Sequence, residues 1–107
     1  MFVYRYMTNI YVKKVLKNVN IFTIFYSNWC IWSIKAIKLL KQHNVKFKGY
    51  KIDKIDGGVK FLSIKFLENS SLNYDPNHLT RPIIFKDCKF LGGYSDLEKY
   101  FQTKRPL

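Results

Sequence analysis

The sequence predicts an α/β fold, in which a four-stranded mixed sheet is flanked by helices. Near residue 30 an apolar run of β-forming residues gives way to helical spacing, and a second strand-like run follows that helix. A strand–helix–strand unit of this kind joins two parallel strands by a right-handed crossover. Near the end of the chain, two short apolar runs flank Lys86-Asp87, which predicts an antiparallel hairpin and hence a mixed sheet.

The first predicted helix covers residues 8–18. Thr8 or Asn9 can cap it, because a short polar side chain accepts a hydrogen bond from a free N–H group of the first turn. Its lysines fall on the side that we expect to face solvent, and its apolar side carries Ile10, Val15, Leu16 and Val19. Residues 21–26 (IFTIFY) follow as a buried strand, because nearly all of them favour β structure.

Ser27-Asn28 signals a turn between this strand and a second helix. That helix begins near Ile31, where the spacing of apolar residues becomes helical, and it ends at Asn44. Its apolar side carries Ile34, Ile37 and Leu40. Residues 46–52 alternate in character and predict the second strand, which a loop at residues 54–58 follows.

The second half of the chain supplies a third helix and the hairpin. Residues 59–69 (VKFLSIKFLEN) have an amphipathic pattern that predicts the helix. Residues 70–78 are polar and contain a proline, so they predict a loop. We expect the two strands of the hairpin at residues 83–85 and near residues 89–91.

A last helix closes the predicted fold. Gly92-Gly93 ends the fourth strand, and we expect Ser95 to cap a helix that runs to about Gln102. No repeat, low-complexity segment or linker interrupts the chain. The sequence therefore predicts one domain at residues 1–107, with its core at about residues 21–102.

The charge of the chain is strongly basic. Lys and Arg outnumber Asp and Glu by 19 to 7, which gives a net charge of +12, and no acidic residue precedes Asp53. A charge of this sign favours anionic partners such as small anions, nucleic acid or an acidic surface. An AT-rich genome also produces such a lysine bias, so the charge alone does not assign a function.

Cysteine and histidine usage excludes several classes of protein. Two cysteines are too few for a disulfide scaffold, and two histidines at this spacing make no zinc site, so no metal ligands are predicted. Free thiols fit a reducing compartment, so we expect a cytoplasmic protein, while the basic N-terminal stretch leaves an organelle address open. No apolar run approaches the length of a membrane span, and no membrane partner is expected.

Cys30 is the candidate for chemistry. It falls just after the first strand and at the beginning of a helix, where free N–H groups and the helix dipole favour the thiolate form. Lys35 and Lys38, one and two turns further on, add positive potential. Trp29 and Trp32 straddle the cysteine, so at least one of them is expected to be exposed. Neither histidine is near Cys30 in the sequence, which disfavours a cysteine–histidine hydrolase.

Three segments together resemble the glutaredoxin family, whose members have the thioredoxin fold. The strand, the polar turn, the motif Cys30-Ile31-Trp32-Ser33 and the helix resemble the family's active site in its monothiol form. Thr80-Arg81-Pro82 resembles its Thr-x-Pro segment, whose proline is cis. Gly92-Gly93-Tyr94-Ser95-Asp96 resembles its Gly-Gly-x-x-Asp segment, which binds glutathione. The order and spacing also agree, and the resemblance covers about residues 21–101.

The resemblance implies a glutathione-dependent oxidoreductase in which Cys30 is the nucleophile. Arg81 and Pro82 would present their backbone to the cysteinyl part of glutathione, Lys35 or Arg81 would meet its glycyl carboxylate, and Trp32 would form a wall of the groove. Ser95 and Asp96 would hold the γ-glutamyl end. The implied glutathione-binding residues are Lys35, Arg81, Pro82, Gly93, Ser95 and Asp96.

The motif also departs from the family pattern. Ser33 replaces the second thiol, so the chain can follow only the monothiol route, and glutathionylated proteins or small mixed disulfides are the expected substrates. Ile31 replaces the usual proline or glycine, and Trp32 replaces a tyrosine or phenylalanine. Ser27 stands where many members have a lysine or arginine that touches glutathione, which weakens binding unless Lys35 or Arg81 compensates. Cys88 falls in the hairpin turn, where we expect it to be inert.

Two alternatives to catalysis stay open. In the first, a homodimer binds a [2Fe–2S] cluster, with Cys30 of each subunit and two glutathiones as ligands. In the second, a basic module of this fold binds nucleic acid or an acidic protein through the lysine-rich side of the first helix. No nucleic-acid motif is present, so nucleic acid is not the expected partner, and we favour the oxidoreductase.

Overall fold

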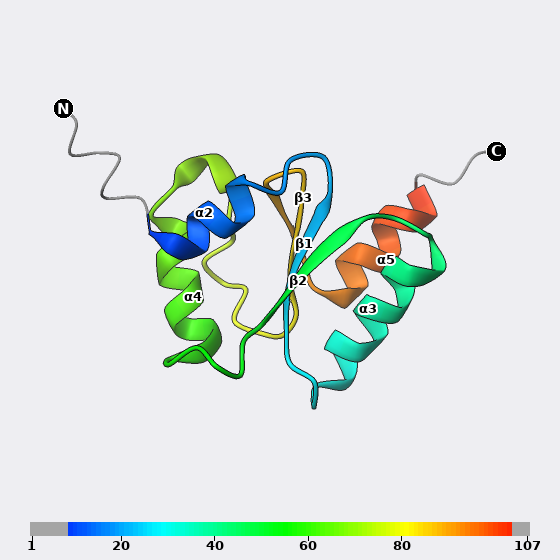
Figure 1. Ribbon diagram of the computed structural model, residues 1–107, viewed down its shortest axis with the longest axis horizontal. Coiled ribbons are helices and arrows are strands. Elements are labelled where there is room, and N and C mark those ends of the chain that lie inside the picture. The colour runs from blue at the N-terminus through cyan, green and yellow to red at the C-terminus, as the bar shows by residue number, and fades with distance from the viewer. Residues whose placement is uncertain (1–8, 104–107) are drawn as a thin grey trace.

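The computed structural model describes residues 9–103, whose arrangement is shown in Figure 1. The elements follow in the order α2 (Ile10–Leu16), β1 (Phe22–Tyr26), α3 (Ile31–Gln42), β2 (Phe47–Lys51), α4 (Gly58–Leu67), the 3-10 helix η1 (Ser70–Leu72), β3 (Ile83–Lys86), β4 (Lys89–Gly92) and α5 (Tyr94–Thr103). All four predicted strands are present. Thr8, one of the two predicted caps of the first helix, lies outside the described residues.

The four strands form one mixed sheet in the order β2-β1-β3-β4. β1 pairs in parallel with β2 and antiparallel with β3, with Ile24 opposite Ile84. β3 and β4 form the predicted hairpin, and Asp87 and Cys88 make its turn with positive φ angles. The predicted fold class is therefore confirmed. The cysteine motif follows the C-terminal end of β1, which has a neighbouring strand on each side.

Helices cover both faces of the sheet, with α3 and α5 on one face and α2 and α4 on the other (Figure 1). Successive side chains of a strand point to opposite faces. Ile24 of β1 accordingly joins a buried cluster with Ala36 of α3 and Leu97 of α5, whereas Phe25 joins one with Phe66 of α4 and Val15 of α2. The sheet thus separates two cores, and α3 with its leading cysteine is fixed by the first of them.

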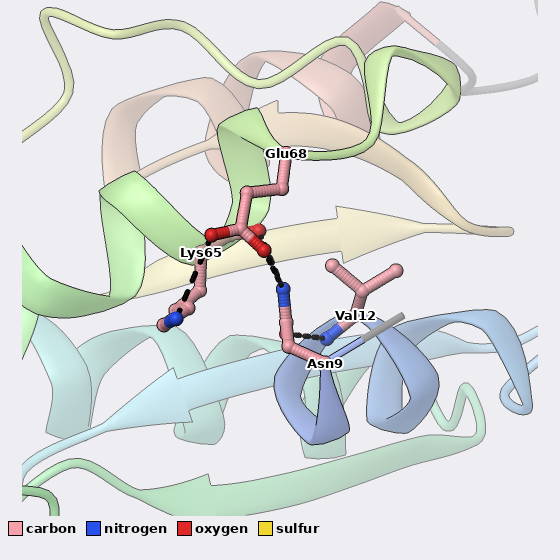
Figure 2. A network of polar contacts seen from close by, with 4 residues as sticks. All are labelled: Asn9, Val12, Lys65 and Glu68. Atoms are coloured by element: carbon pink, nitrogen blue, oxygen red, sulfur yellow. Dashed lines mark hydrogen bonds and ion pairs between the residues drawn. The ribbon is translucent and has the colours of Figure 1, made fainter. Parts of the chain in front are cut away.

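Asn9 begins α2 and fastens it to α4, as Figure 2 shows. Its Oδ1 accepts a hydrogen bond from the Val12 N–H group at 2.8 Å, which confirms the predicted cap. Its Nδ2 donates to Glu68 Oε1 at 2.8 Å and to the Lys65 carbonyl oxygen at 3.0 Å. Lys65 and Glu68 also form an ion pair at 3.5 Å. α2 is therefore anchored on the face opposite α3.

The apolar side of α2 differs from the prediction. The helix ends at Leu16, so Val19 lies beyond it and is exposed, and Ile10 in the first turn is exposed as well. Val12 takes the expected place of Ile10 and is buried beside Val15. The prediction was wrong because seven residues make only about two turns, too few for the spacing of apolar residues to define one face.

The predicted loop at residues 70–78 contains the short helix η1, which the sequence pattern did not indicate. Asn69 caps it by accepting a hydrogen bond from the Ser71 N–H group at 2.9 Å, and Leu72 is fully buried. One buried leucine in a polar stretch therefore anchors this segment to the core. Within residues 9–103, no helix has both the length and the apolar character needed to cross a membrane.

The start of α5 also differs from the prediction. Ser95 is not the cap, because the helix begins one residue earlier, at Tyr94, and the Leu97 N–H group donates to the Gly93 carbonyl oxygen at 3.1 Å. Asp96 supplies the side-chain contact: its Oδ2 accepts the Gly93 N–H group at 3.0 Å. This is the reciprocal half of a capping box, in which the third helical residue reaches back to the residue before the helix.

Candidate active site

Cys30 occupies the N-cap position of α3, as the sequence predicts. Its N–H group donates to the Ser27 carbonyl oxygen at 3.2 Å, and its own carbonyl oxygen accepts the Ile34 N–H group at 3.0 Å. The side chain is half-buried, and Sγ lies 3.9 Å from the carbonyl oxygen of Arg81. The turn and the first helical bond therefore fix the thiol at the open end of β1, beside the segment that precedes β3.

Ser33, the last residue of the motif, has a structural contact. Its side chain is fully buried, and its Oγ accepts the Ser27 N–H group at 3.2 Å, just after β1 ends. The Ser33 hydroxyl thus provides an acceptor for the Ser27 N–H group, which lies beyond the end of β1. The serine that replaces a second thiol therefore ties the turn before Cys30 to the helix after it.

We expect Ser33→Ala to lower the free energy of unfolding by about 1–3 kcal/mol, because the buried Ser27 N–H group loses its acceptor. Chemical denaturation of both proteins measures this difference. Ser63→Ala is the matched control, since Ser63 is also buried but its Oγ donates to the Lys60 carbonyl oxygen within α4. Equal stability of Ser33→Ala and the wild type would contradict the assignment of this contact.

A cavity of about 400 Å³ opens between α3, the segment before β3 and the start of α5. The peptide bond between Arg81 and Pro82 is cis, in agreement with the resemblance. Five predicted site residues line the cavity: Trp32, Arg81, Gly93, Ser95 and Asp96. Three further lining residues, His78, Thr80 and Tyr94, were not among the predicted site residues.

The Gly92-Gly93 pair shapes one end of the cavity. Gly92 has a φ of +136°, and a Cβ there would overlap the Asp96 carboxylate, so the bond from the Gly93 N–H group to Asp96 depends on glycine at 92. Ser95 and Asp96 lie in the first turn of α5, where N–H groups without helical partners favour a bound carboxylate. This end of the cavity therefore combines donors for an anion with one carboxylate for a cation.

Arg81 is held on two sides at the other end of the cavity. Its Nε donates to the buried Ser27 Oγ at 2.8 Å, and its guanidinium carbon lies 4.9 Å from the centre of the Trp29 ring. The Trp29 indole N–H group in turn donates to Asp53 Oδ1 at 2.9 Å. Arg81 is therefore oriented by residues from the motif turn and from the loop after β2.

Asp53 balances part of this positive charge. Its pKa is lowered chiefly by a hydrogen bond from the Ser27 hydroxyl and further by the Trp29 indole, the Asn28 backbone and the charge of Arg81, while desolvation opposes them. Asp53 is consequently ionised at neutral pH. Ser27 thus links the Arg81 guanidinium to the Asp53 carboxylate. In the sequence alone, this serine was notable only because a basic residue was expected in its place.

Lys35, the other predicted contact for the glycyl carboxylate, has a different position. Its Nζ lies 5.2 Å from the centre of the Trp32 ring, and Lys35 does not line the cavity. Trp32 itself packs against Tyr94, with ring centres 5.7 Å apart, and forms a wall of the cavity as predicted. Of the two basic residues that the sequence offered for the carboxylate, Arg81 is the one at the cavity.

His78 is a lining residue that no sequence signal distinguished from its polar loop. Its Nε2 lies 3.1 Å from the Pro82 carbonyl oxygen, and its ring packs edge-on against Phe90. A Cβ at Gly93 would lie 3.2 Å from the His78 ring. His78 thus contacts both the Pro82 backbone and Gly93, and so connects the segment before β3 to the start of α5.

Cys88 lies in the hairpin turn, as predicted, and its surroundings are those of an inert thiol. Its Sγ contacts the carbonyl oxygens of Val15 and Leu16 at 3.4 and 3.5 Å, at the end of α2. Burial, and to a smaller extent Asp87, raises the pKa of this thiol, against a smaller opposing effect of Lys89. Cys88 is therefore protonated at neutral pH, and it is a poor nucleophile.

We expect Cys88 to react slowly with iodoacetamide at neutral pH, and to react faster as the pH rises through its raised pKa. Alkylation of the Cys30→Ser variant, followed by mass spectrometry, measures Cys88 alone. The same variant unfolded in denaturant is the control, because unfolding removes the burial. Equal rates in the folded and unfolded states would contradict this prediction.

Comparison with known proteins identifies the family. The sequence model of the glutaredoxin family matches residues 12–73. A probable glutaredoxin of Acanthamoeba polyphaga mimivirus is 34% identical over 100 residues, which cover 92% of this chain and 94% of that protein. The chain belongs to the glutaredoxin family. Glutaredoxin-2 of Schizosaccharomyces pombe is a further relative, 31% identical over 89 residues, or 83% of this chain and 74% of that protein.

Solved glutaredoxin structures share the fold. The dithiolic glutaredoxin 2-C-Grx1 of Trypanosoma brucei brucei superposes with a TM-score of 0.69 at 24% identity, over 91% of each chain. A buckwheat glutaredoxin in complex with glutathione superposes with a TM-score of 0.64 at 20% identity, over 89% of this chain and 83% of that one. At these identities the likeness establishes the fold of a glutaredoxin and leaves the site to be argued from this chain's residues.

Membership of the glutaredoxin family assigns a general thiol–disulfide oxidoreductase activity to the chain. The matched residues 12–73 include Cys30 and exclude Cys88. In the part of the chain that the structure describes, no group of three or more histidine, cysteine, aspartate or glutamate side chains is placed to hold a metal ion. The thiol of Cys30 and the cavity beside it are therefore the features on which a specific function can be argued.

Proposed function

We propose that the protein is a glutathione-dependent oxidoreductase that removes glutathione from mixed disulfides by a monothiol route through Cys30. One observation carries the proposal: the Cys30 thiol lies 3.9 Å from the carbonyl oxygen of Arg81, whose residue lines the 400 Å³ cavity. A disulfide sulfur that reaches Cys30 is thus next to a space lined by a cation, by helix N–H groups and by the Asp96 carboxylate. Glutathione carries two carboxylates and one ammonium group, which these three features complement.

The reaction takes two exchanges and one protein thiol. The Cys30 thiolate attacks the glutathionyl sulfur of the mixed disulfide, the old S–S bond breaks, and the substrate thiolate leaves and takes up a proton. Cys30 now carries glutathione in a new disulfide. The thiolate of a second glutathione attacks the glutathionyl sulfur, which releases glutathione disulfide and regenerates the Cys30 thiolate. One disulfide is consumed and one is formed, so each turnover uses one reduced glutathione, whose thiol is oxidised as the substrate thiol is released in reduced form.

The orientation of glutathione follows from the charges of the cavity. The carboxylate of its γ-glutamyl end fits the first turn of α5, where Ser95 lies, and its ammonium group fits Asp96. Its glycyl carboxylate fits the Arg81 guanidinium at the other end. The cysteinyl part of glutathione then lies between these two ends, along the backbone of Arg81, whose carbonyl oxygen is 3.9 Å from the Cys30 sulfur. The complex of a buckwheat glutaredoxin of the same fold with glutathione supports this ligand for the fold.

Both cysteines are free, and the exchange needs a supply of reduced glutathione. We therefore propose a reducing, cytoplasmic setting for the reaction, with glutathionylated proteins as substrates.

The proposal is tested by trapping the intermediate. We expect the reduced protein, mixed with glutathione disulfide, to gain one glutathionyl group on Cys30, as peptide mass spectrometry can localise it. Added glutathione should remove the group again. Cys30→Ser should gain none, because Cys88 is partly buried and the pKa of its thiol is raised. A wild-type protein that forms no adduct at Cys30, or forms it only at Cys88, would refute the proposal.

The cluster-bridged dimer finds no comparable support. It needs the Cys30 thiols of two copies at one cluster, together with two glutathione thiolates. Trp29, Ile31 and Trp32 are all at least half exposed around Cys30, and each copy carries a net charge of +12. Two copies would bring these bulky side chains and like charges together. No contact within residues 9–103 favours that arrangement over thiol exchange, so we do not propose it.

A further inference from the structure

Cys30 is surrounded by exposed apolar side chains. Trp29 is 68% exposed, Ile31 56%, Trp32 50% and Ile34 46%. Single exposed apolar residues are ordinary on a protein surface, but a contiguous group marks a place where another molecule binds. These four side chains fall within six consecutive residues that include the proposed nucleophile. We name this group, Trp29, Ile31, Trp32 and Ile34, the apolar collar.

The geometry of α3 places lysines directly beyond the collar. Residues three and four apart share a side of a helix, so Ile31, Ile34, Lys35 and Lys38 follow one another along its exposed side. The opposite side carries Ser33, Ala36 and Leu40, which are fully buried. The surface that leads away from Cys30 is therefore apolar for the first turn of α3 and basic for the next.

The carboxylates nearest the collar come from other segments of the chain: Asp53 beside Trp29, and Asp96 and Glu98 of α5, where Tyr94 packs against Trp32. Residues 9–52, which form α2, β1, α3 and β2, contain nine lysines and neither aspartate nor glutamate. The first acidic residue, Asp53, is engaged by the Trp29 indole and the Ser27 hydroxyl. Asp96 accepts the Gly93 N–H group and Glu98 accepts the Tyr94 hydroxyl, so these carboxylates have partners on α5. The exposed side of α3 itself carries lysines and no carboxylate, and its positive charge attracts acidic partners and raises their rate of association.

We propose that the apolar collar, with Lys35 and Lys38 at its border, docks polypeptide substrates that carry acidic and apolar residues beside the glutathionylated cysteine. This rests on the proposed function, because the collar surrounds the thiol that the substrate's sulfur must reach. The apolar side chains of the substrate cover the collar, and its carboxylates lie along the exposed side of α3. A small mixed disulfide reacts through the cavity, where it meets Trp32 alone of the collar and neither of the lysines.

Charge and chemistry decide between the candidate occupants of the collar. A second copy of the chain would bring a second charge of +12 to the same surface, so like charges oppose it. The lysines attract a nucleic acid, but its phosphate groups do not bury the apolar side chains of Ile31 and Ile34, which stay exposed to water. An acidic and apolar polypeptide satisfies both the charge and the apolar surface.

The experiment compares two glutathionylated peptides of equal length, with the cysteine at the centre and leucines beside it. Acidic residues flank this core in one peptide, and lysines flank it in the other. We expect kcat/KM for the acidic peptide to be about ten-fold higher at low ionic strength, and the ratio to fall as salt is added. A small glutathione mixed disulfide, assayed in parallel, reports the basal reaction.

Matched variants separate the collar from general effects. Ile34→Ser and Lys38→Glu should each lower kcat/KM for the acidic peptide several-fold more than kcat/KM for the small disulfide. Leu67→Ser is the control for the first, because Leu67 of α4 is also 46% exposed. Lys13→Glu is the control for the second, because Lys13 lies on α2, which covers the opposite face of the sheet (Figure 1). Neither control should change the ratio between the peptides.

Each outcome decides one question. Equal turnover of the two peptides, with the small disulfide still turned over, overturns the docking surface and leaves the proposed function standing. If the wild-type protein turns over none of the three substrates, the proposed function is overturned, and this inference with it. A dimer in sedimentation, dissociated by Ile34→Ser, assigns the collar to a second copy. Inhibition by a single-stranded oligonucleotide at the same concentrations as the acidic peptide assigns it to nucleic acid. Both assignments contradict the proposal.

Discussion

Replacing Cys30 with serine is expected to abolish turnover of a glutathione mixed disulfide, with a loss of about a thousand-fold or more in kcat/KM. A serine hydroxyl is not ionised at neutral pH and does not displace a thiolate from a disulfide, so the first exchange cannot begin. The substitution changes one atom at the N-cap, a position that serine favours, and the fold should be kept. A coupled assay with glutathione and glutathione reductase measures the rate.

The control for this loss is Cys88→Ser. Cys88 lies in the β3–β4 turn with its sulfur against the end of α2, and it should not contribute to the reaction. We expect turnover within about two-fold of the wild type for that variant. Activity retained by Cys30→Ser and lost in Cys88→Ser would move the nucleophile to the hairpin and refute the monothiol route through Cys30.

The position of Cys30 was predictable because the signals for it are local. Strand-forming residues end at Tyr26, a polar turn follows, and helical spacing begins at Ile31, so a cysteine between them must lie at the start of a helix. The strand–helix–strand order also fixed the parallel pairing of β1 and β2. The glycine pair marked the beginning of α5, although Ser95 was expected to cap the helix, whereas Gly93 precedes it and Asp96 accepts the Gly93 N–H group.

What the sequence did not show are contacts between segments far apart in the chain. Ser27 and Arg81 are 54 residues apart, and Trp29 and Asp53 are 24 apart, so no local pattern joins them. Ser33 is buried because of the way α3 packs, which the spacing of residues does not reveal. The contact between His78 and the Pro82 carbonyl oxygen depends on the path of an irregular loop. In each case the tertiary fold, which sequence spacing does not encode, brings the partners together.

The Ser27–Arg81 contact changes how the missing basic residue before the motif is understood. In the family pattern that the sequence resembles, a lysine or arginine often stands where this chain has Ser27. Here the serine accepts a hydrogen bond from Arg81 Nε, so the cation comes from the segment before β3 and the serine orients it. Trp29 supports its flat face. Arg81 thus brings a positive charge to the cavity although position 27 carries no basic residue.

We therefore expect Arg81→Gln to raise KM for glutathione about ten- to a hundred-fold with little change in kcat, because a charged hydrogen bond to a carboxylate contributes about 1.5–3 kcal/mol. The bond is equally strong before and during the exchange, so it acts on binding and not on the chemical step. Steady-state kinetics at varied glutathione concentration separates the two constants. The KM of Arg81→Lys should lie between those of the wild type and Arg81→Gln. Lysine keeps the charge, but it loses the planar pair of guanidinium donors and the hydrogen bond to Ser27.

Lys35→Gln is the matched control, because it removes the same charge from a side chain that packs on Trp32 outside the cavity. We expect its KM for glutathione to stay within about two-fold of the wild type, since Lys35 is exposed to solvent and makes no contact inside the cavity. The opposite pattern, a large rise in KM for Lys35→Gln and none for Arg81→Gln, would place the glycyl carboxylate on α3. Ser27 would then orient a guanidinium that glutathione does not use, and the charge would be supplied by the helix that Cys30 begins.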